Sequence, residues 1–285
     1  VIAVLTNIDA EHLDQYRDVE EIQQTFGNFA NKVPVYCPVI LCLDDPNLQG
    51  LIPRIERKII SYGFSAQADY YARDHAFDRF TSQSTLFRRG RRLGALRLSV
   101  PGPHTILNAL AAVAVGMDLD IPVEAILKAV ESYTGTGRRF ELKREVAEVM
   151  IVEDYAHHPT EIRATLEAAK RGWQRRVVAV FQPHRYTRVA ALQAQFATAF
   201  NQADVLVLTE IYPAGEDPIA GVDGKALYEE VRQFGHRQVH FEPDLTKVAA
   251  LLKGILVRGD IVLVLGAGNV SRTIPDIIAV LEAGS

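Results

Sequence analysis

The stretch EVMIVEDYAHHPTEI, residues 148–162, decides the fold of the second half of the chain. Its apolar run at 148–154 predicts a buried strand. Pro159 and Glu161 suit the first turn of a following helix, where proline loses no hydrogen bond and a carboxylate faces the positive end of the helix dipole. The same pattern recurs, with strands at about 176–182, 204–210, 238–241 and 260–265 and helices at about 160–171, 189–202, 224–234, 244–253 and 270–282. This alternation predicts a doubly wound α/β sheet.

The first half of the chain shows a related pattern. Strands are predicted at 1–6 and 38–43, helices at about 18–32, 46–57, 104–117 and 122–132, and short alternating runs over 68–99 with a hairpin tip at 88–92. This alternation favours a second parallel sheet. The flexible stretch Thr134-Gly135-Thr136-Gly137 marks the boundary, so we expect two domains, 1–134 and 135–285. A buried strand that begins at residue 1 suggests that the chain starts inside its first domain.

Composition and charge narrow the class of protein. Hydrophobic residues make up 48% of the 285 residues and the net charge is −4, which predicts a globular chain without a global attraction to nucleic acid. No apolar run approaches the roughly 20 residues that span a bilayer, and no secretory signal opens the chain, so we expect no membrane partner and a cytoplasmic location. Cys37 and Cys42 lie in an apolar run without metal or redox spacing, which favours buried reduced thiols.

Polar residues gather directly after the predicted strands of the second domain. In doubly wound sheets ligands bind beyond the carboxyl ends of the strands. After the first strand stand Asp154, Tyr155, His157 and His158, and we favour a polar ligand site over helix capping alone as their explanation. After the third strand, Glu210, Tyr212 and Glu216 lie on a Pro/Gly loop whose carboxylates suit the ammonium group of an amino acid.

Two further segments of this domain suggest close contact with a ligand. Arg185 and Arg188 lie three residues apart at a predicted helix start, where both guanidinium groups can face one carboxylate or phosphate. The stretch Gly266-Ala267-Gly268-Asn269 indicates a close backbone approach near a ligand. It does not complete a dinucleotide fingerprint, because Ser271 stands in place of the third glycine.

The first domain offers two candidate segments. TNIDAEHLD, residues 6–14, contains His12 among carboxylates that could bind a hard metal or cap a helix. PGPHTILN, residues 101–108, starts a helix on which His104 and Asn108 share a face, where they could contact a flat heterocycle or serve as caps.

Taken in order, these segments resemble the Mur ligases over nearly the whole chain. The resemblance implies an incomplete central ATPase domain followed by a Rossmann-like C-terminal domain. It implies ATP and Mg²⁺ as cofactors, with His12 as a magnesium ligand and His104 and Asn108 at the adenine. It also implies that Arg138 or Arg139 approaches the ATP phosphates and that Asp154 contacts the ribose.

FQPHRYTR, residues 181–188, and EIYPAGE, residues 210–216, are similar to the alanine-adding branch of that family. This implies an ATP-dependent amide ligase of peptidoglycan precursor synthesis that joins L-alanine to UDP-N-acetylmuramate through an acyl-phosphate. The catalytic residues would be His157, Arg185 and Arg188. The substrate-binding residues would be Tyr155, His157, Arg185, Arg188, Glu210, Tyr212 and Glu216.

The sequence contains no phosphate-binding loop of the form G-x-x-x-x-G-K-[ST]. Our hypothesis is therefore that the chain belongs to a longer protein and is inactive by itself. Two alternatives stay open at this point. One is a ligase of the same family that recycles murein tripeptide, and the other is a nucleotide-binding module without ligase chemistry. The oligomeric state does not follow from the sequence.

Overall fold

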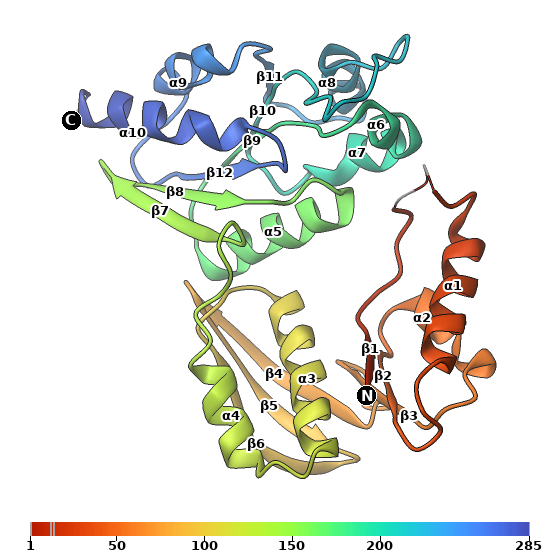
Figure 1. Cartoon of the computed structure of the whole chain (residues 1–285). Coiled ribbons are helices and arrows are strands. Elements are labelled where there is room, and N and C mark those ends of the chain that lie inside the picture. Colours follow the sequence, from red (N-terminus) through yellow and green to blue (C-terminus); the bar gives the residue numbers. More distant parts are fainter. Residues whose placement is uncertain (1, 12, 14, 285) are drawn as a thin grey trace. The chain divides into compact units, whose positions relative to one another are not determined.

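The computed structural model describes residues 2–11, 13 and 15–284, which form two compact units, 1–134 and 135–285 (Figure 1). Unit 1 contains a six-stranded sheet in the order β1-β2-β3-β4-β5-β6. Its strands are β1 Ala3–Leu5, β2 Val39–Cys42, β3 Ile59–Gly63, β4 Tyr70–Asp78, β5 Thr81–Arg88 and β6 Arg91–Leu98. Neighbouring strands pair in parallel from β1 to β4 and antiparallel from β4 to β6. The sheet is therefore mixed, where the sequence favoured a parallel one.

The helices of unit 1 are α1 Val19–Asn31, α2 Pro46–Gln49, the 3-10 turn η1 Ile52–Arg54, α3 Pro103–Asp118 and α4 Val123–Glu131. The helix predicted at about 46–57 is wrong in length. Gly50 is a poor helix former, and Pro53 has no N–H to donate to the carbonyl four residues earlier, so the helix ends at Gln49. The hairpin tip is confirmed, since Arg89 and Gly90 connect β5 and β6 with φ values of 46° and 82°.

The core of unit 1 lies between the sheet and helix α3. Ile106, Leu110 and Val113 of α3 are fully buried in one apolar cluster with Leu41 and Leu86 of the sheet. The two cysteines are buried and neither is in a disulfide, as the sequence predicted. Burial raises the pKa of Cys42 to about 11, so this thiol stays protonated and unreactive at neutral pH.

Unit 2 contains a second six-stranded sheet, in the order β11-β10-β9-β12-β8-β7. Its strands are β7 Glu141–Val146, β8 Val149–Asp154, β9 Val177–Phe181, β10 Val205–Leu208, β11 Val239–Phe241 and β12 Ile261–Leu265. Strands β8 to β12 pair in parallel, and β7 joins β8 antiparallel. The helices are α5 Pro159–Gly172, α6 Tyr186–Ala191, α7 Gln193–Ala199, α8 Gly224–Gln233, α9 Leu245–Lys253, the 3-10 turn η2 Val270–Thr273 and α10 Ile274–Glu282.

Three features of unit 2 differ from the sequence prediction. Strand β7 was not anticipated, because ELKREV at 141–146 is mostly charged and mostly exposed at the sheet edge, where charged side chains disfavour pairing with a further strand. The helix predicted at 189–202 is divided at Leu192, whose φ of −117° and ψ of 19° leave the helical region. The last helix begins as a 3-10 turn, since Pro275 cannot donate the hydrogen bond that would continue an α-helix through it.

Helices cover both faces of this sheet, which confirms the doubly wound arrangement (Figure 1). Val180 and Val264 lie in one buried cluster with residues of α9 and α10, whereas Phe181 packs on Phe196 of α7 with ring centroids 5.8 Å apart. Because the helices bury both faces, the edge at the carboxyl ends of the strands is where loops can form a site. Among the described residues, no helix is long and apolar enough to cross a membrane.

Candidate functional site

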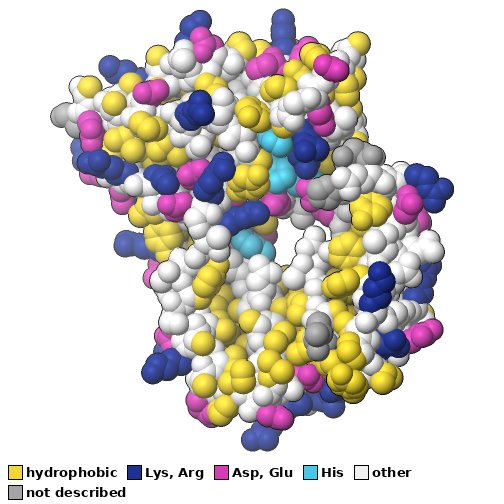
Figure 2. Space-filling view, in the orientation of Figure 1, with side chains coloured by type: hydrophobic (Ala, Val, Ile, Leu, Met, Phe, Trp, Pro, Cys, Tyr) yellow, Lys and Arg dark blue, Asp and Glu magenta, His cyan; other side chains and the backbone are white. Residues whose placement is uncertain are grey.

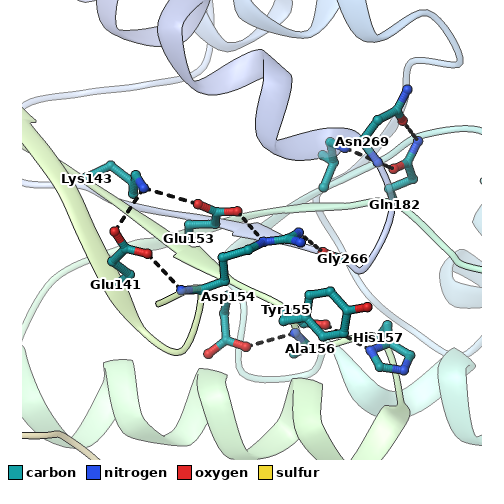
Figure 3. Close-up of polar contacts among 12 residues, drawn as sticks. Glu141, Lys143, Glu153, Asp154, Tyr155, Ala156, His157, Gln182, Gly266 and Asn269 are labelled. Atoms are coloured by element: carbon teal, nitrogen blue, oxygen red, sulfur yellow. Dashed lines mark hydrogen bonds and ion pairs between the residues drawn. The ribbon is translucent and has the colours of Figure 1, made fainter. Parts of the chain in front are cut away.

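The strand register of unit 2 aligns the four loops that carry the predicted site. Leu265 of β12 pairs with Asp154 of β8 on one side and with Phe181 of β9 on the other, and Phe181 pairs with Leu208 of β10. The residues that follow these four strands therefore start from one row at the edge of the sheet. Figure 3 shows the loops after β8, β9 and β12 meeting there.

Four aromatic rings from three of these loops form a continuous series. Tyr155 and His157 contact edge to face with centroids 5.2 Å apart, and His157 and His184 lie 5.9 Å apart. His184 stacks on Tyr212 at 5.5 Å with an interplanar angle of 14°. All four side chains are half-buried, so each packs against protein and keeps a surface open to a ligand. Histidine side chains beside basic residues reach the surface of unit 2 in Figure 2.

The two arginines predicted to bind an anion lie against this series of rings. The Nη1 atom of Arg188 is 3.3 Å from Nδ1 of His184 and donates to the His184 carbonyl oxygen at 3.3 Å. Arg185 has a φ of 69° and a ψ of 134°, which is a strained conformation for a residue with a side chain. Its N–H donates to the carbonyl of Tyr212 at 2.9 Å. This hydrogen bond joins the loop after β9 to the loop after β10.

His184 is uncharged at neutral pH. Burial, together with the nearby charges of Arg188 and Arg185, lowers its pKa from the usual 6.5 to about 4. Because a guanidinium only donates, a bond from Arg188 to Nδ1 places the His184 proton on Nε2. The positive charge on this side of the site therefore comes from the arginines, and the imidazole can offer a neutral N–H.

The two carboxylates of the loop after β10, Glu210 and Glu216, accept hydrogen bonds from other groups of unit 2. Glu210 Oε1 accepts from the N–H groups of Ile211 at 2.9 Å and Gly224 at 2.7 Å. Glu216 accepts from Thr187 Oγ1 at 2.6 Å and lies 4.0 Å from Arg185. Burial acts to raise the pKa of Glu216, but the Thr187 bonds and the Arg185 charge outweigh it and lower this pKa. Both carboxylates hold loops, and their contact with a substrate ammonium stays a prediction.

The loop after β8 is organised by two buried groups. Asp154 is 6% exposed and accepts from Phe140 N–H at 2.9 Å and Ala156 N–H at 2.8 Å. The pKa of Asp154 is raised, chiefly because burial disfavours its charged form. His158 caps α5 through Nδ1, in a reciprocal capping box with Glu161, so the structure gives His158 the capping role that the sequence left as the weaker explanation. The predicted contact of Asp154 with a ribose is untested.

The adjacent arginines Arg138 and Arg139 have different surroundings. The Nε atom of Arg138 lies 2.7 Å from Glu153, and its Nη2 donates to the Gly266 carbonyl at 3.0 Å. Arg139 is more exposed and pairs with Glu161 at 3.1 Å. Their predicted contact with ATP phosphates is likewise untested.

Sequence reasoning did not single out Gln182 or His184. The Gln182 side chain is buried and accepts through Oε1 from the N–H groups of Asn269 at 2.9 Å and Val270 at 3.0 Å. It therefore fastens the loop after β12 to the end of β9. A Cβ on Gly268 would lie 2.4 Å from this oxygen, so the predicted close approach is to protein atoms. Both residues lie in the loop that follows the wholly apolar strand β9. That position could have identified them as site residues from the sequence.

The predicted residues of unit 1 lie on α3 or outside the described part. Asn108 is exposed on α3, and His104 is half-buried one turn earlier. The predicted metal ligand, His12, lies outside the described residues. Within residues 2–11, 13 and 15–284, no group of three or more His, Cys, Asp or Glu side chains is arranged to hold a metal.

Comparison with known proteins identifies the class. Residues 1–116 match the profile of the Mur ligase middle domain, and residues 138–268 match that of the Mur ligase glutamate ligase domain. The chain belongs to the Mur ligase family.

Its relatives include the UDP-N-acetylmuramate–L-alanine ligase of Syntrophotalea carbinolica, 52% identical over 95% of this chain, and that of Pelobacter propionicus, 46% identical over all of it. The chain spans 59% and 62% of the lengths of these two relatives.

Solved structures support the same fold. The UDP-N-acetylmuramate–alanine ligase MurC of Thermotoga maritima matches all of this chain and 60% of its own, with a TM-score of 0.77 and 24% identity. MurF ligase of Thermotoga maritima in complex with ADP matches all of this chain and 63% of its own, with a TM-score of 0.77 and 20% identity. At these identities the likeness establishes the arrangement of the chain within each unit.

Proposed function

We propose that this chain supplies the middle and C-terminal domains of an ATP-dependent ligase that joins L-alanine to UDP-N-acetylmuramate in the cytoplasm. The observation that carries the proposal is the convergence of Tyr155, His157, Arg185 and Arg188 at the ends of β8 and β9, the two strands that flank β12. These are the positions at which the sequence resembles the alanine-adding branch. The 52% identity with a ligase of that name supports the choice of substrates.

The proposed reaction forms an amide in two steps. A carboxylate oxygen of UDP-N-acetylmuramate bonds to the γ-phosphorus of ATP while ADP leaves. The nitrogen of L-alanine then bonds to the carboxyl carbon while phosphate leaves. Both steps bring anionic groups together, and positive groups that are fixed in advance lower the energy of such charge.

The residues of unit 2 suit the carboxylates of this reaction. Arg185 and Arg188 provide planar forks of donors, the geometry that binds a carboxylate through two hydrogen bonds. His184 can add a neutral N–H beside Arg188, and Tyr155 can add a hydroxyl. We assign His157 to the reacting end of the substrate, because its ring lies between those of Tyr155 and His184.

ATP and Mg²⁺ belong to the proposal with different support. Asn108 is exposed on α3 and Arg139 is largely exposed, so both are accessible to a nucleotide. The described residues do not supply a cluster of metal ligands, and His12 lies outside them. When bound, Mg²⁺ would neutralise charge on the ATP phosphates.

A chimeric enzyme tests the proposal. In the Syntrophotalea carbinolica ligase, this chain replaces the part that it matches. Phosphate release is then measured with ATP, L-alanine and UDP-N-acetylmuramate. We expect release that depends on both L-alanine and UDP-N-acetylmuramate, and none from the 285-residue chain alone, whose sequence lacks the phosphate-binding loop.

Matched variants make the test specific to the proposed site. Arg185→Lys keeps the charge but loses the fork, so the chimera should lose at least roughly tenfold in kcat/KM. Arg144→Gln, which removes an exposed ion pair with Glu282, should leave it unchanged. Activity with a murein tripeptide in place of L-alanine, or activity that survives Arg185→Lys, would overturn the assignment.

A further inference from the structure

Arg138 is attached to unit 2 through its backbone on both sides. Its N–H donates to Glu141 Oε2 at 2.7 Å, and its carbonyl accepts from the N–H of Tyr155 at 2.8 Å. Its φ of 58° lies in the left-handed region, which residues with a side chain adopt only where the surroundings hold them. The chain is therefore fixed to the sheet from this residue onward.

The guanidinium of Arg138 contacts three parts of the site at once. Nε pairs with Glu153 Oε1 at 2.7 Å, Nη2 donates to the carbonyl of Gly266 at 3.0 Å, and the planar group lies 4.6 Å from the centre of the Tyr155 ring. Figure 3 shows Glu153 on β8, Tyr155 in the loop after β8 and Gly266 in the loop after β12 close to one another. One side chain thus links the loop that carries Tyr155 to the loop that Gln182 fastens to β9.

The partner of Arg138 explains why this contact is kept. The Glu153 carboxylate is only 7% exposed, and without Arg138 it would retain Lys143 Nζ at 3.3 Å as its cationic neighbour. Leaving a buried carboxylate without its close cationic partner costs free energy. Arg138 should therefore stay paired with Glu153 even when a phosphate group is nearby. Arg139 differs, because its partner Glu161 is itself 31% exposed.

We propose that Arg138 is a positioning residue that holds the Tyr155 ring and the Gly266 loop in place. This role replaces the phosphate contact that the resemblance to the Mur ligases implied for Arg138 or Arg139. The inference rests on the proposed function only in treating Tyr155 as a substrate ligand. Arginine is required for this role because a flat fork can pair with a carboxylate, donate to a carbonyl and stack on a ring together. A lysine ammonium is a single point charge and cannot span the three.

Hydrogen exchange and histidine NMR on the 285-residue chain test this role without any substrate. In Arg138→Gln we expect the amides of Ala156, Asn269 and Val270 to exchange roughly tenfold faster, the change expected from losing a charged hydrogen bond. The ring signals of His157 should shift as Tyr155 moves. Arg138→Lys should show both effects, and Arg144→Gln neither.

Each other outcome counts against the proposal. Unchanged exchange and unchanged His157 signals in a folded Arg138→Gln protein would overturn it, and so would full rescue of both by Arg138→Lys. If Arg138→Gln fails to fold, Glu153→Gln is tested in its place. This substitution keeps the shape of the Glu153 side chain but removes its charge, which weakens its interaction with Arg138. The same amides must then exchange faster. Because no readout uses a substrate, a failure of the ligase proposal leaves this test unaffected.

Discussion

The Nη1 atom of Arg188 lies 3.3 Å from Nδ1 of His184, which precedes helix α6. Burial of the His184 ring disfavours its charged form, and the permanent cation of Arg188 beside it acts in the same direction, so the pKa of His184 is lowered. At the end of β9, Arg188 therefore carries the positive charge and the His184 ring is neutral.

Removing the cation should raise the pKa of His184. In the unmodified chain we expect a midpoint of about 4 in an NMR titration of the imidazole. Arg188→Gln should move it toward the ordinary value of about 6.5, without reaching it, because burial remains. Arg144→Gln removes a remote charge and should leave the midpoint in place. An unchanged midpoint in Arg188→Gln would show that burial alone sets this pKa.

The same histidine makes the stability of the chain depend on pH. Its pKa is lower in the folded state than in the unfolded state, so the unfolded state binds more protons between these values. The contribution is fully present above about pH 6.5 and is lost as pH falls toward 4. We expect about 1–2 kcal/mol after allowance for solvent screening. Urea unfolding at several pH values should show a flatter dependence for His184→Gln.

The backbone strain at Arg185 should reverse the usual order of alanine and glycine. With a φ of 69°, glycine fits this position and alanine does not. We expect Arg185→Gly to be more stable than Arg185→Ala by about 1 kcal/mol, although both lose the guanidinium. At Lys225, inside α8, alanine should be the more stable of the same two substitutions. Thermal unfolding of the four variants decides the matter.

The close approach of Gly268 predicts a large effect from one added methyl group. A Cβ there would lie 2.4 Å from Gln182 Oε1 and 2.8 Å from the Tyr212 ring. Gly268→Ala should destabilise the chain by about 1–3 kcal/mol, with a shift in the ring signals of Tyr212 and His184. Gly254→Ala is the control, because its nearest neighbour would be an ordinary 3.6 Å away. Equal effects at the two glycines would contradict the packing argument.

The ion pair of Arg176 with the buried Asp260 should be far more sensitive to substitution than an exposed ion pair of unit 2. Asp260 is 1% exposed and receives Nε and Nη2 of Arg176 at 3.1 Å each. Asp260→Ala removes the carboxylate partner of that guanidinium, which keeps the Ile255 carbonyl at 2.6 Å, and should cost about 3 kcal/mol of unfolding free energy. Glu282→Gln, in the exposed pair with Arg144, should cost less than about 1 kcal/mol. Similar losses of unfolding free energy in both variants would refute the distinction.

The accuracy of the sequence prediction follows the strength of the local signal. Wholly apolar runs such as 177–181 and 261–265 gave strands within a residue or so of the observed bounds, because burial on both faces demands such runs. Strand β7 escaped notice, since its charged sequence is stabilised by pairing with β8 along the sheet edge. The helix at 46–57 failed where Gly50 and Pro53 outweighed the apolar spacing.

The sequence by itself determined which residues follow each strand of unit 2, and hence that Tyr155, His157, Arg185 and Arg188 stand at the edge formed by the carboxyl ends of the strands. Strand periodicity and turn chemistry are local properties, so one sequence suffices to find them. Only the tertiary structure decided that β12 lies between β8 and β9, which brings Gly266 to Arg138. Strand order depends on packing between segments that are distant in the sequence. The same packing decides which polar side chains form hydrogen bonds or ion pairs within the protein.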